Sequence, residues 1–324
     1  MKLVQNLRRF APDPYIAAIV GMVVLASILP CRGNAADYLK IVTNFAIALL
    51  FFLYGIRISP QAIWEGISHW RLQALVFGFT FVVFPAIGLL LAHLARPWLG
   101  AQMATGVVFL SLLPSTVQSS IVFTSIARGN VAAALCAASL SNLVGMLLTP
   151  ILVALILGLR GGAGGQGLKD ILEQLFLPFA AGQLLRPWLA ALLGRHRFVV
   201  GLVDRSSILL VVYSAFSESV VGGLWHQVGV ASLAVLVAVN IFLLGAVMAS
   251  TMLLSRVFGF SREDRIAIVF CGSKKSLASG VPMANILFPA ASVGPIVLPL
   301  MLFHQIQLMA CAALAKRYAS EKPN

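Results

Sequence analysis

The sequence has 324 residues, of which 60% are hydrophobic and 10% are charged, and its mean hydropathy is +0.97. This composition excludes an ordinary soluble globular protein. The length accommodates about ten membrane spans of roughly 20 residues, with little left for a soluble domain. The net charge of +13 does not call for a nucleic-acid partner, because most basic residues fall in the short segments between spans. The four cysteines have no paired spacing and indicate neither a disulfide framework nor a zinc site.

Ten apolar runs follow one another along the chain. We expect spans near residues 14–30, 40–56, 72–95, 100–127, 131–159, 170–193, 200–219, 227–254, 263–288 and 293–315. With the N-terminus in the cytoplasm, 16 of the 23 lysines and arginines fall in cytoplasmic segments and 5 on the opposite side, as the positive-inside rule requires. The sequence therefore predicts an all-α, multi-pass protein of a bacterial inner membrane, embedded in the lipid bilayer as a monomer, with both termini cytoplasmic.

A glycine-rich segment divides the ten spans into two groups of five. Residues 160–167 do not form a phosphate-binding loop, because no strand precedes them and no Gly-Lys-Ser/Thr follows. We expect 160–169 to be an extracytoplasmic linker between a first repeat, 1–159, and a second repeat, 170–324. Since five is odd, the second repeat enters the membrane from the opposite face, and the two repeats are inverted.

Polar residues interrupt one apolar run in each half. The ninth span contains two adjacent lysines, Lys274 and Lys275, and each ammonium would cost roughly 2.5–3.5 kcal/mol at the centre of a membrane helix. The fourth span contains the hydroxyl-rich segment 115–120 about 158 positions earlier. Such segments are tolerated where they line a cavity, and paired interruptions indicate discontinuous helices around a midplane binding site.

These interruptions, with polar residues of spans 5 and 10, supply the candidate substrate- and ion-binding residues. They are Ser115, Thr116, Gln118, Ser119, Ser120, Ser139, Asn142, Ser273, Lys274, Lys275, Ser276, His304 and Gln305. For each group a structural alternative stays open. The lysines could reach the cytoplasmic interface with their long side chains, and the hydroxyl and amide groups could serve helix–helix packing. The prolines Pro85, Pro178, Pro282 and Pro299 are interpreted as helix kinks with no further role.

The distribution of charge favours an anionic solute. All ten acidic residues lie at span ends or in loops, and only Glu218 is placed to reach into the membrane. A carboxylate metal cluster or a carboxylate proton relay is therefore not expected, and the strongest charges at membrane depth are Lys274 and Lys275. Such a pair suits a bound organic anion, or a lysine that gains and loses a proton during transport.

Several stretches, in their order and spacing, resemble the bile acid:sodium symporter superfamily along nearly the whole chain. The similarity is greatest to its SBF-like branch, the type of solute carrier family 10 member 7 and its bacterial relatives. The stretches that carry the resemblance are Pro114–Ser120, Arg128–Asn130, Leu148–Pro150, Pro178–Gln183 and, most specifically, Ile266–Met283.

The resemblance implies ten helices in two inverted five-helix repeats, divided into a core and a panel domain, with broken helices 4 and 9 crossing in the core. It also implies sodium-coupled uptake of an organic anion. The family's sodium-site glutamate falls here on Phe270, and the glutamine and asparagine that follow fall on Lys274 and Lys275. Two hydroxyl positions fall on Ala134 and Ala138. These replacements count against sodium as the coupling ion and indicate proton coupling or uniport, with an ammonium in the place of the cation.

Three function classes compete at this point. The leading prediction is a secondary transporter of a small organic anion that works by alternating access. The alternative is a non-transporting membrane regulator or sensor, for example of ion homeostasis, against which the short loops and lack of a signalling domain count. A serine–lysine dyad enzyme is a third possibility, but Ser273 and Lys274 point to different faces of a helix. We therefore expect no enzyme activity, no catalytic residue, no bound metal and no cofactor.

Overall fold

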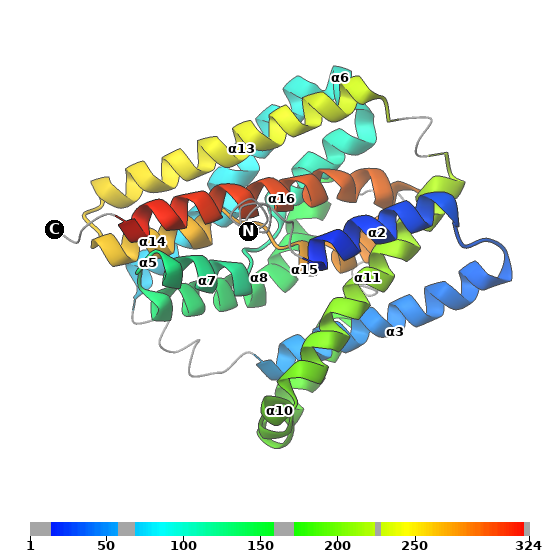
Figure 1. Ribbon diagram of the computed structural model, residues 1–324, viewed down its shortest axis with the longest axis horizontal. Helices are drawn as coiled ribbons and strands as arrows, with labels where there is room; N and C mark the ends of the chain where they lie inside the picture. Colours follow the sequence, from blue (N-terminus) through cyan, green and yellow to red (C-terminus); the bar gives the residue numbers. More distant parts are fainter. Residues whose placement is uncertain (1–13, 58–68, 159–171, 224–227, 321–324) are drawn as a thin grey trace, which may run out of the picture.

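A computed structural model describes residues 14–57, 69–158, 172–223 and 228–320, and within these ranges the chain is helical, without strands (Figure 1). The linker expected at 160–169 and both chain ends lie outside the described residues. The helices are α2 (Pro14–Ile28), α3 (Asn34–Arg57), α5 (Trp70–Gly78), α6 (Phe84–Leu112), α7 (Gln118–Ile126), α8 (Val131–Leu157), α10 (Leu177–Arg195), α11 (Arg197–Val221), α13 (Val230–Val257), α14 (Arg262–Gly272), α15 (Leu277–Leu287) and α16 (Ala290–Ser320), with π-helices η1 (Phe79–Val83) and η2 (Leu172–Phe176).

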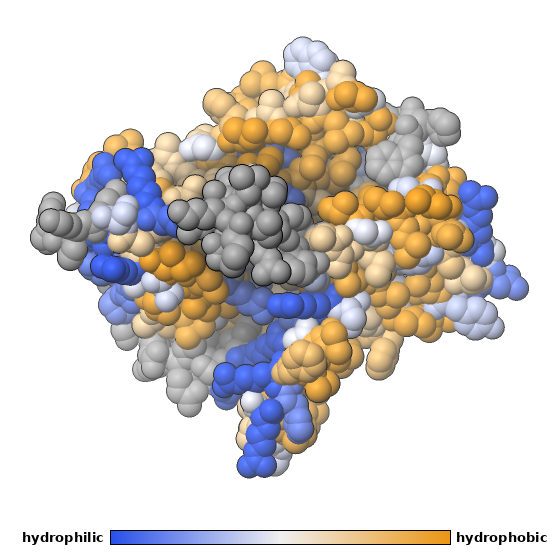
Figure 2. All heavy atoms as spheres, in the orientation of Figure 1, coloured by the Kyte–Doolittle hydropathy of each residue, from blue (hydrophilic) through white to orange (hydrophobic). Residues whose placement is uncertain are grey.

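The described residues contain six segments long and apolar enough to cross a membrane. They are 34–57, 70–112, 131–157, 197–221, 230–257 and 290–320. Large apolar side chains such as Leu155, Trp188 and Phe198 are exposed, and broad hydrophobic areas cover the face seen in Figure 2. In water this surface would drive association, whereas lipid covers it at no such cost. The expected all-helical, multi-pass membrane protein is confirmed; the inverted repeat of ten helices stays a prediction.

The connection between the third and fourth spans is shorter than expected. The sequence predicts separate spans over 72–95 and 100–127, and the structure also has two helical segments here, which join directly at a kink at Gly100. Gly100 has φ 72° and ψ 173°, a conformation that is accessible almost only to glycine. One residue therefore replaces the expected loop.

The helices pack in two groups. In the first group α3 packs along α10, and α11 packs against both α2 and α3. In the second, α6 packs against α13 and α16, while α14 contacts α5, α7 and α8. Figure 1 shows α3 and α10 at one side of the molecule and α13 with α6 at the other. The groups meet where α11 contacts α15 and α16.

Two glycines allow the close approach of α3 and α10. A Cβ atom on Gly55 would collide with the carbonyl oxygen of Phe179, and one on Gly182 would collide with that of Phe52. Small residues at such crossings let helix backbones approach in a membrane, where association depends on packing and not on the exclusion of water.

We expect Gly55→Ala to destabilise the protein by about 1–3 kcal/mol, because the added methyl group forces the α3 and α10 backbones apart. Thermal unfolding of the purified protein in detergent measures the effect. Gly245→Ala in α13 is the matched control, since a Cβ there has no atom within 4 Å and alanine favours a helix. A loss of stability in the control equal to that in Gly55→Ala would contradict the assigned crossing.

Candidate functional site

The two interruptions predicted in spans 4 and 9 are present, and they contact each other. α6 ends before Leu113, whose extended backbone (ψ 155°) suits the residue that precedes Pro114, and α7 begins only at Gln118. In the other half, residues 273–276 separate α14 from α15. The Ser276 N–H donates a hydrogen bond of 2.9 Å to the Pro114 carbonyl, which joins one break to the other.

Hydroxyl groups in the first break and in the first turn of α7 extend this contact. Ser120 Oγ donates to the Phe270 carbonyl at 2.9 Å, and Thr116 Oγ1 lies 2.7 Å from Ser119 Oγ. Ser276 Oγ accepts from the Ser279 N–H and so caps α15.

The α8 helix supports the same break from its other side. The Ser115 N–H donates to Ser141 Oγ at 3.1 Å, and the Asn142 side-chain amide donates to the Ser115 carbonyl. The hydroxyl of Ser115 itself is buried without a hydrogen-bond partner among the described residues. The side chain of Asn142 therefore stabilises the shape of the break by binding the backbone of Ser115.

The ammonium of Lys275 is buried at the C-terminal end of α6. Its side chain has no exposed surface. Nζ donates hydrogen bonds to the carbonyl oxygens of Thr80 at 2.7 Å, Ser111 at 2.6 Å and Leu113 at 2.7 Å. An ammonium has three N–H donors, so backbone carbonyls occupy all of them. The Phe84 ring centre lies 4.2 Å away and adds a cation–π contact.

The Thr80 carbonyl is available because the helix around it has lost a donor. In η1 the Phe84 N–H bonds to the Phe79 carbonyl. The next residue, Pro85, is the π-helical partner for the Thr80 carbonyl and has no N–H to donate. The interpretation of Pro85 as a kink without a further role is therefore wrong: it leaves a carbonyl free for Lys275.

A second proline helps to leave a carbonyl without a helical donor at the end of α6. Pro114 has no N–H for the Ser111 carbonyl, and the following N–H, that of Ser115, bonds to Ser141 instead. The last carbonyls of any helix lack helical donors and carry the negative end of its dipole. The first break therefore presents negative partial charge to Lys275.

Lys274 is equally buried, but its ammonium has fewer partners. Among the described residues it makes one hydrogen bond, of 3.3 Å, to Ser119 Oγ. It lies 4.1 Å from the ring centre of Phe123 and 5.5 Å from that of Phe270. Ser119 belongs to the first turn of α7, where the helix dipole is positive. The backbone that compensates Lys275 therefore does not compensate Lys274.

Neither lysine forms an ion pair within the part of the chain that the structure describes. An ion pair elsewhere joins Arg57 to Asp204 at 2.7 Å, between α3 and α11. The alternative in which the lysines reach the cytoplasmic interface is wrong, because both side chains are fully buried in this structure.

Gln307 in α16 is a site residue that the sequence analysis missed. Its Oε1 accepts from the Lys275 N–H at 3.0 Å, and its Nε2 donates to the Lys275 carbonyl at 2.9 Å. Nε2 also lies 2.8 Å from His304 Nδ1, which connects the predicted His304 to the second break. Gln307 is three positions after His304 and hence on the same helix face. This spacing from a predicted site residue could have indicated Gln307 from the sequence.

Four predicted residues are not part of this hydrogen-bonded group. Gln118 is exposed at the start of α7. Ser273 donates back to Val269 in its own helix at 2.6 Å. Ser139 is buried in α8, and Gln305 is half-buried in α16; neither bonds to a break within the described residues. The buried Ser139 and the intrahelical hydrogen bond of Ser273 fit the packing alternative, whereas Gln118 does not, because it is exposed.

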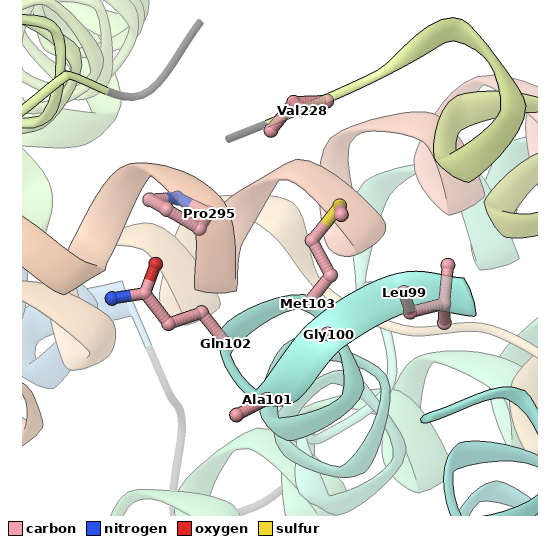
Figure 3. A pocket seen from close by; sticks show the side chains of 7 residues that line it. All are labelled: Leu99, Gly100, Ala101, Gln102, Met103, Val228 and Pro295. Atoms are coloured by element: carbon pink, nitrogen blue, oxygen red, sulfur yellow. The ribbon is translucent and has the colours of Figure 1, made fainter. Parts of the chain in front are cut away.

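A hollow of about 260 Å³ lies elsewhere, at the Gly100 kink (Figure 3). Its lining residues are Leu99, Gly100, Ala101, Gln102, Met103, Val228 and Pro295. The lining is largely apolar, and neither the lysines nor their partners contribute to it. The hollow is therefore separate from the site at the breaks.

Two interrupted helices that meet at buried cations, within an apolar helical fold, are typical of membrane transporters. Residues 13–320 match the model of the SBF-like CPA transporter family, and the chain belongs to this family. The resemblance to the SBF-like branch is thus confirmed.

Relatives of similar length support this assignment. The chain is 52% identical to the Pseudomonas aeruginosa protein PA2026, over 97% of this chain and 95% of the relative. It is 48% identical to the Escherichia coli K12 protein YfeH, over 94% and 92% of the two chains. It is also 29% identical to sodium/bile acid cotransporter 7-B of Xenopus laevis, over 95% of this chain and 91% of that one.

We expect Gln307→Leu to lower the unfolding temperature markedly. The substitution leaves the buried N–H and carbonyl of Lys275 without partners, at a cost of about 1–3 kcal/mol each. Gln305→Leu is the matched control, because the same change at a half-buried position outside the group costs about 0.5 kcal/mol or less. Thermal unfolding in detergent compares the two variants. Equal losses would show that Gln307 has no special role in holding Lys275.

Proposed function

We propose that this protein is a secondary active transporter that moves a small organic anion across the membrane by alternating access. The observation that carries the proposal is the ammonium of Lys274: it is buried where the two helix breaks meet, without an ion pair among the described residues. A buried charge of this kind is costly unless it is paired. A bound anion would supply the missing partner.

The surroundings of Lys274 favour an anion over a cation. The N-terminus of α7 adds positive partial charge beside the ammonium, and helix N-termini commonly bind carboxylate or phosphate groups. Ser119 in this first turn and Thr116 just before the helix offer hydroxyl groups. The rings of Phe123 and Phe270 give an apolar wall, which suits an organic anion better than an inorganic one.

Alternating access would use the two packing groups as moving parts. We assign α2, α3, α10 and α11 to a panel domain, and α5 to α8 with α13 to α16 to a core domain. In this proposal the domains arise from inverted five-helix repeats, 1–159 and 170–324, joined by the linker 160–169. The core, which carries the crossed breaks, would move against the panel and open the site first to one side of an inner membrane and then to the other.

Sodium is not required in this proposal. The position of the family's sodium-site glutamate holds Phe270, and Lys275 brings a positive charge of its own to the breaks. Uptake is then proton-linked or uncoupled. Sodium/bile acid cotransporter 7-B, with 29% identity, carries sodium in its name, and this chain would differ from it in that respect.

We expect the unfolding temperature of the wild type to be the same in sodium chloride and in choline chloride. An ion that binds the folded state stabilises it by about 2.7 kcal/mol at a hundredfold excess over its dissociation constant, so a sodium site would be visible. The comparison is made across a range of salt concentrations at constant ionic strength. Saturable stabilisation by sodium would refute the sodium-free mechanism while leaving the transport of an anion open.

We expect Lys274→Gln to reduce saturable organic-anion uptake at least about tenfold, the equivalent of losing 1.4 kcal/mol of binding. Carboxylates, sulfonates and phosphate esters are first screened for stabilisation of the wild type, and the best ligand is then followed into proteoliposomes. Lys316→Gln, which removes the same charge from an exposed position of α16, should retain uptake. Undiminished uptake in Lys274→Gln would overturn the proposed anion site.

A further inference from the structure

We infer that the carbonyl oxygens of Thr80, Ser111 and Leu113 form a binding site for a monovalent cation, and that the ammonium of Lys275 is its tethered occupant. Removal of that side chain then leaves a site that binds a free ammonium or primary alkylammonium ion. The inference concerns Lys275 alone and does not depend on transport of an organic anion.

The geometry is that of a cation-binding site made by backbone. Three carbonyl oxygens lie 2.6–2.7 Å from one nitrogen, and the Phe84 ring covers it at 4.2 Å. Rings of backbone carbonyls replace the hydration shell of monovalent cations in channel selectivity filters. The three acceptors match the three N–H groups of a primary ammonium ion.

The site is built independently of the lysine side chain that fills it. The Thr80 carbonyl has no helical donor because the Phe84 N–H bonds to Phe79 and Pro85 has no N–H. The Ser111 carbonyl has none because Pro114 has no N–H and the Ser115 N–H bonds to Ser141. Neither arrangement involves the side chain at position 275. The main chain at position 275 is held by Gln307. The carbonyls should therefore keep their arrangement, and their unsatisfied acceptors, when the side chain is truncated.

The adjacent Lys274 does not have such a carbonyl site around its ammonium. Nζ of Lys274 has a single hydroxyl as its hydrogen-bond partner among the described residues. It lies at the positive end of a helix dipole, whereas Nζ of Lys275 lies at a negative end. Only Lys275→Ala should leave a vacancy that attracts a cation, and Lys274→Ala is the matched control.

The test is chemical rescue of Lys275→Ala. This substitution removes Cγ, Cδ, Cε and Nζ, which together correspond to n-propylammonium. Unfolding temperatures are measured in choline chloride with added ammonium, methylammonium, n-propylammonium or tetramethylammonium. We expect a saturable rise of about 2 °C or more, largest with n-propylammonium. Tetramethylammonium, which has no N–H donor, should give none.

Wild type and Lys274→Ala, measured in the same series, should show no saturable rise. If Lys275→Ala does not fold alone, the yield of monodisperse protein is compared after extraction with and without n-propylammonium, and a gain confined to this variant supports the site. The inference is overturned if primary amines affect neither unfolding temperature nor yield. It is also overturned if tetramethylammonium, the wild type or Lys274→Ala gives an equal response.

Discussion

The compensation of one buried ammonium by backbone carbonyls is the interaction on which the centre of this protein depends. A charge at membrane depth without a carboxylate must find other partners, and Lys275 finds three carbonyl oxygens. Those carbonyls lie in the π-helix η1, near the end of α6 and directly after it, where helical hydrogen bonding is interrupted. The interruption and the lysine therefore stabilise each other: the lysine satisfies orphaned acceptors, and the acceptors make a buried cation tolerable.

Two neighbouring lysines consequently have different properties. Lys275 is fixed between the end of α6 and the π-helix before it, with its main chain held by Gln307. Lys274 lies beside the first turn of α7 with one hydroxyl partner among the described residues. One break exposes both a negative and a positive helix end, and each lysine lies at one of them. This asymmetry separates an ammonium that backbone carbonyls compensate from one that has a single hydroxyl partner among the described residues.

The surrounding helices explain how such a centre can be rigid within a protein that is proposed to move. Hydrogen bonds from α8, α14 and α16 hold the breaks on several sides. The close glycine crossing of α3 and α10 lies within the other packing group. Motion between two internally well-packed groups keeps the charge compensation intact, whereas motion within the group that holds the breaks would expose unpaired carbonyls.

The sequence by itself determined the membrane-spanning helical class, the family and the position of both breaks, because apolar runs and their polar interruptions are local patterns. It also placed Lys274 and Lys275 among the site residues. It did not distinguish between them, since adjacent lysines are chemically identical. Their partners lie 155 to 195 positions away along the chain, and only tertiary packing brings them within reach.

The same limit applies to Gln307 and Pro85. Pro85 was interpreted as a kink and Gln307 was not singled out, because each has its role only where a distant segment packs against it. The kink at Gly100 was missed for a related reason: hydropathy cannot tell a loop from a single glycine that redirects a helix. Local chemistry fixes which groups the chain offers, and packing decides which of them meet.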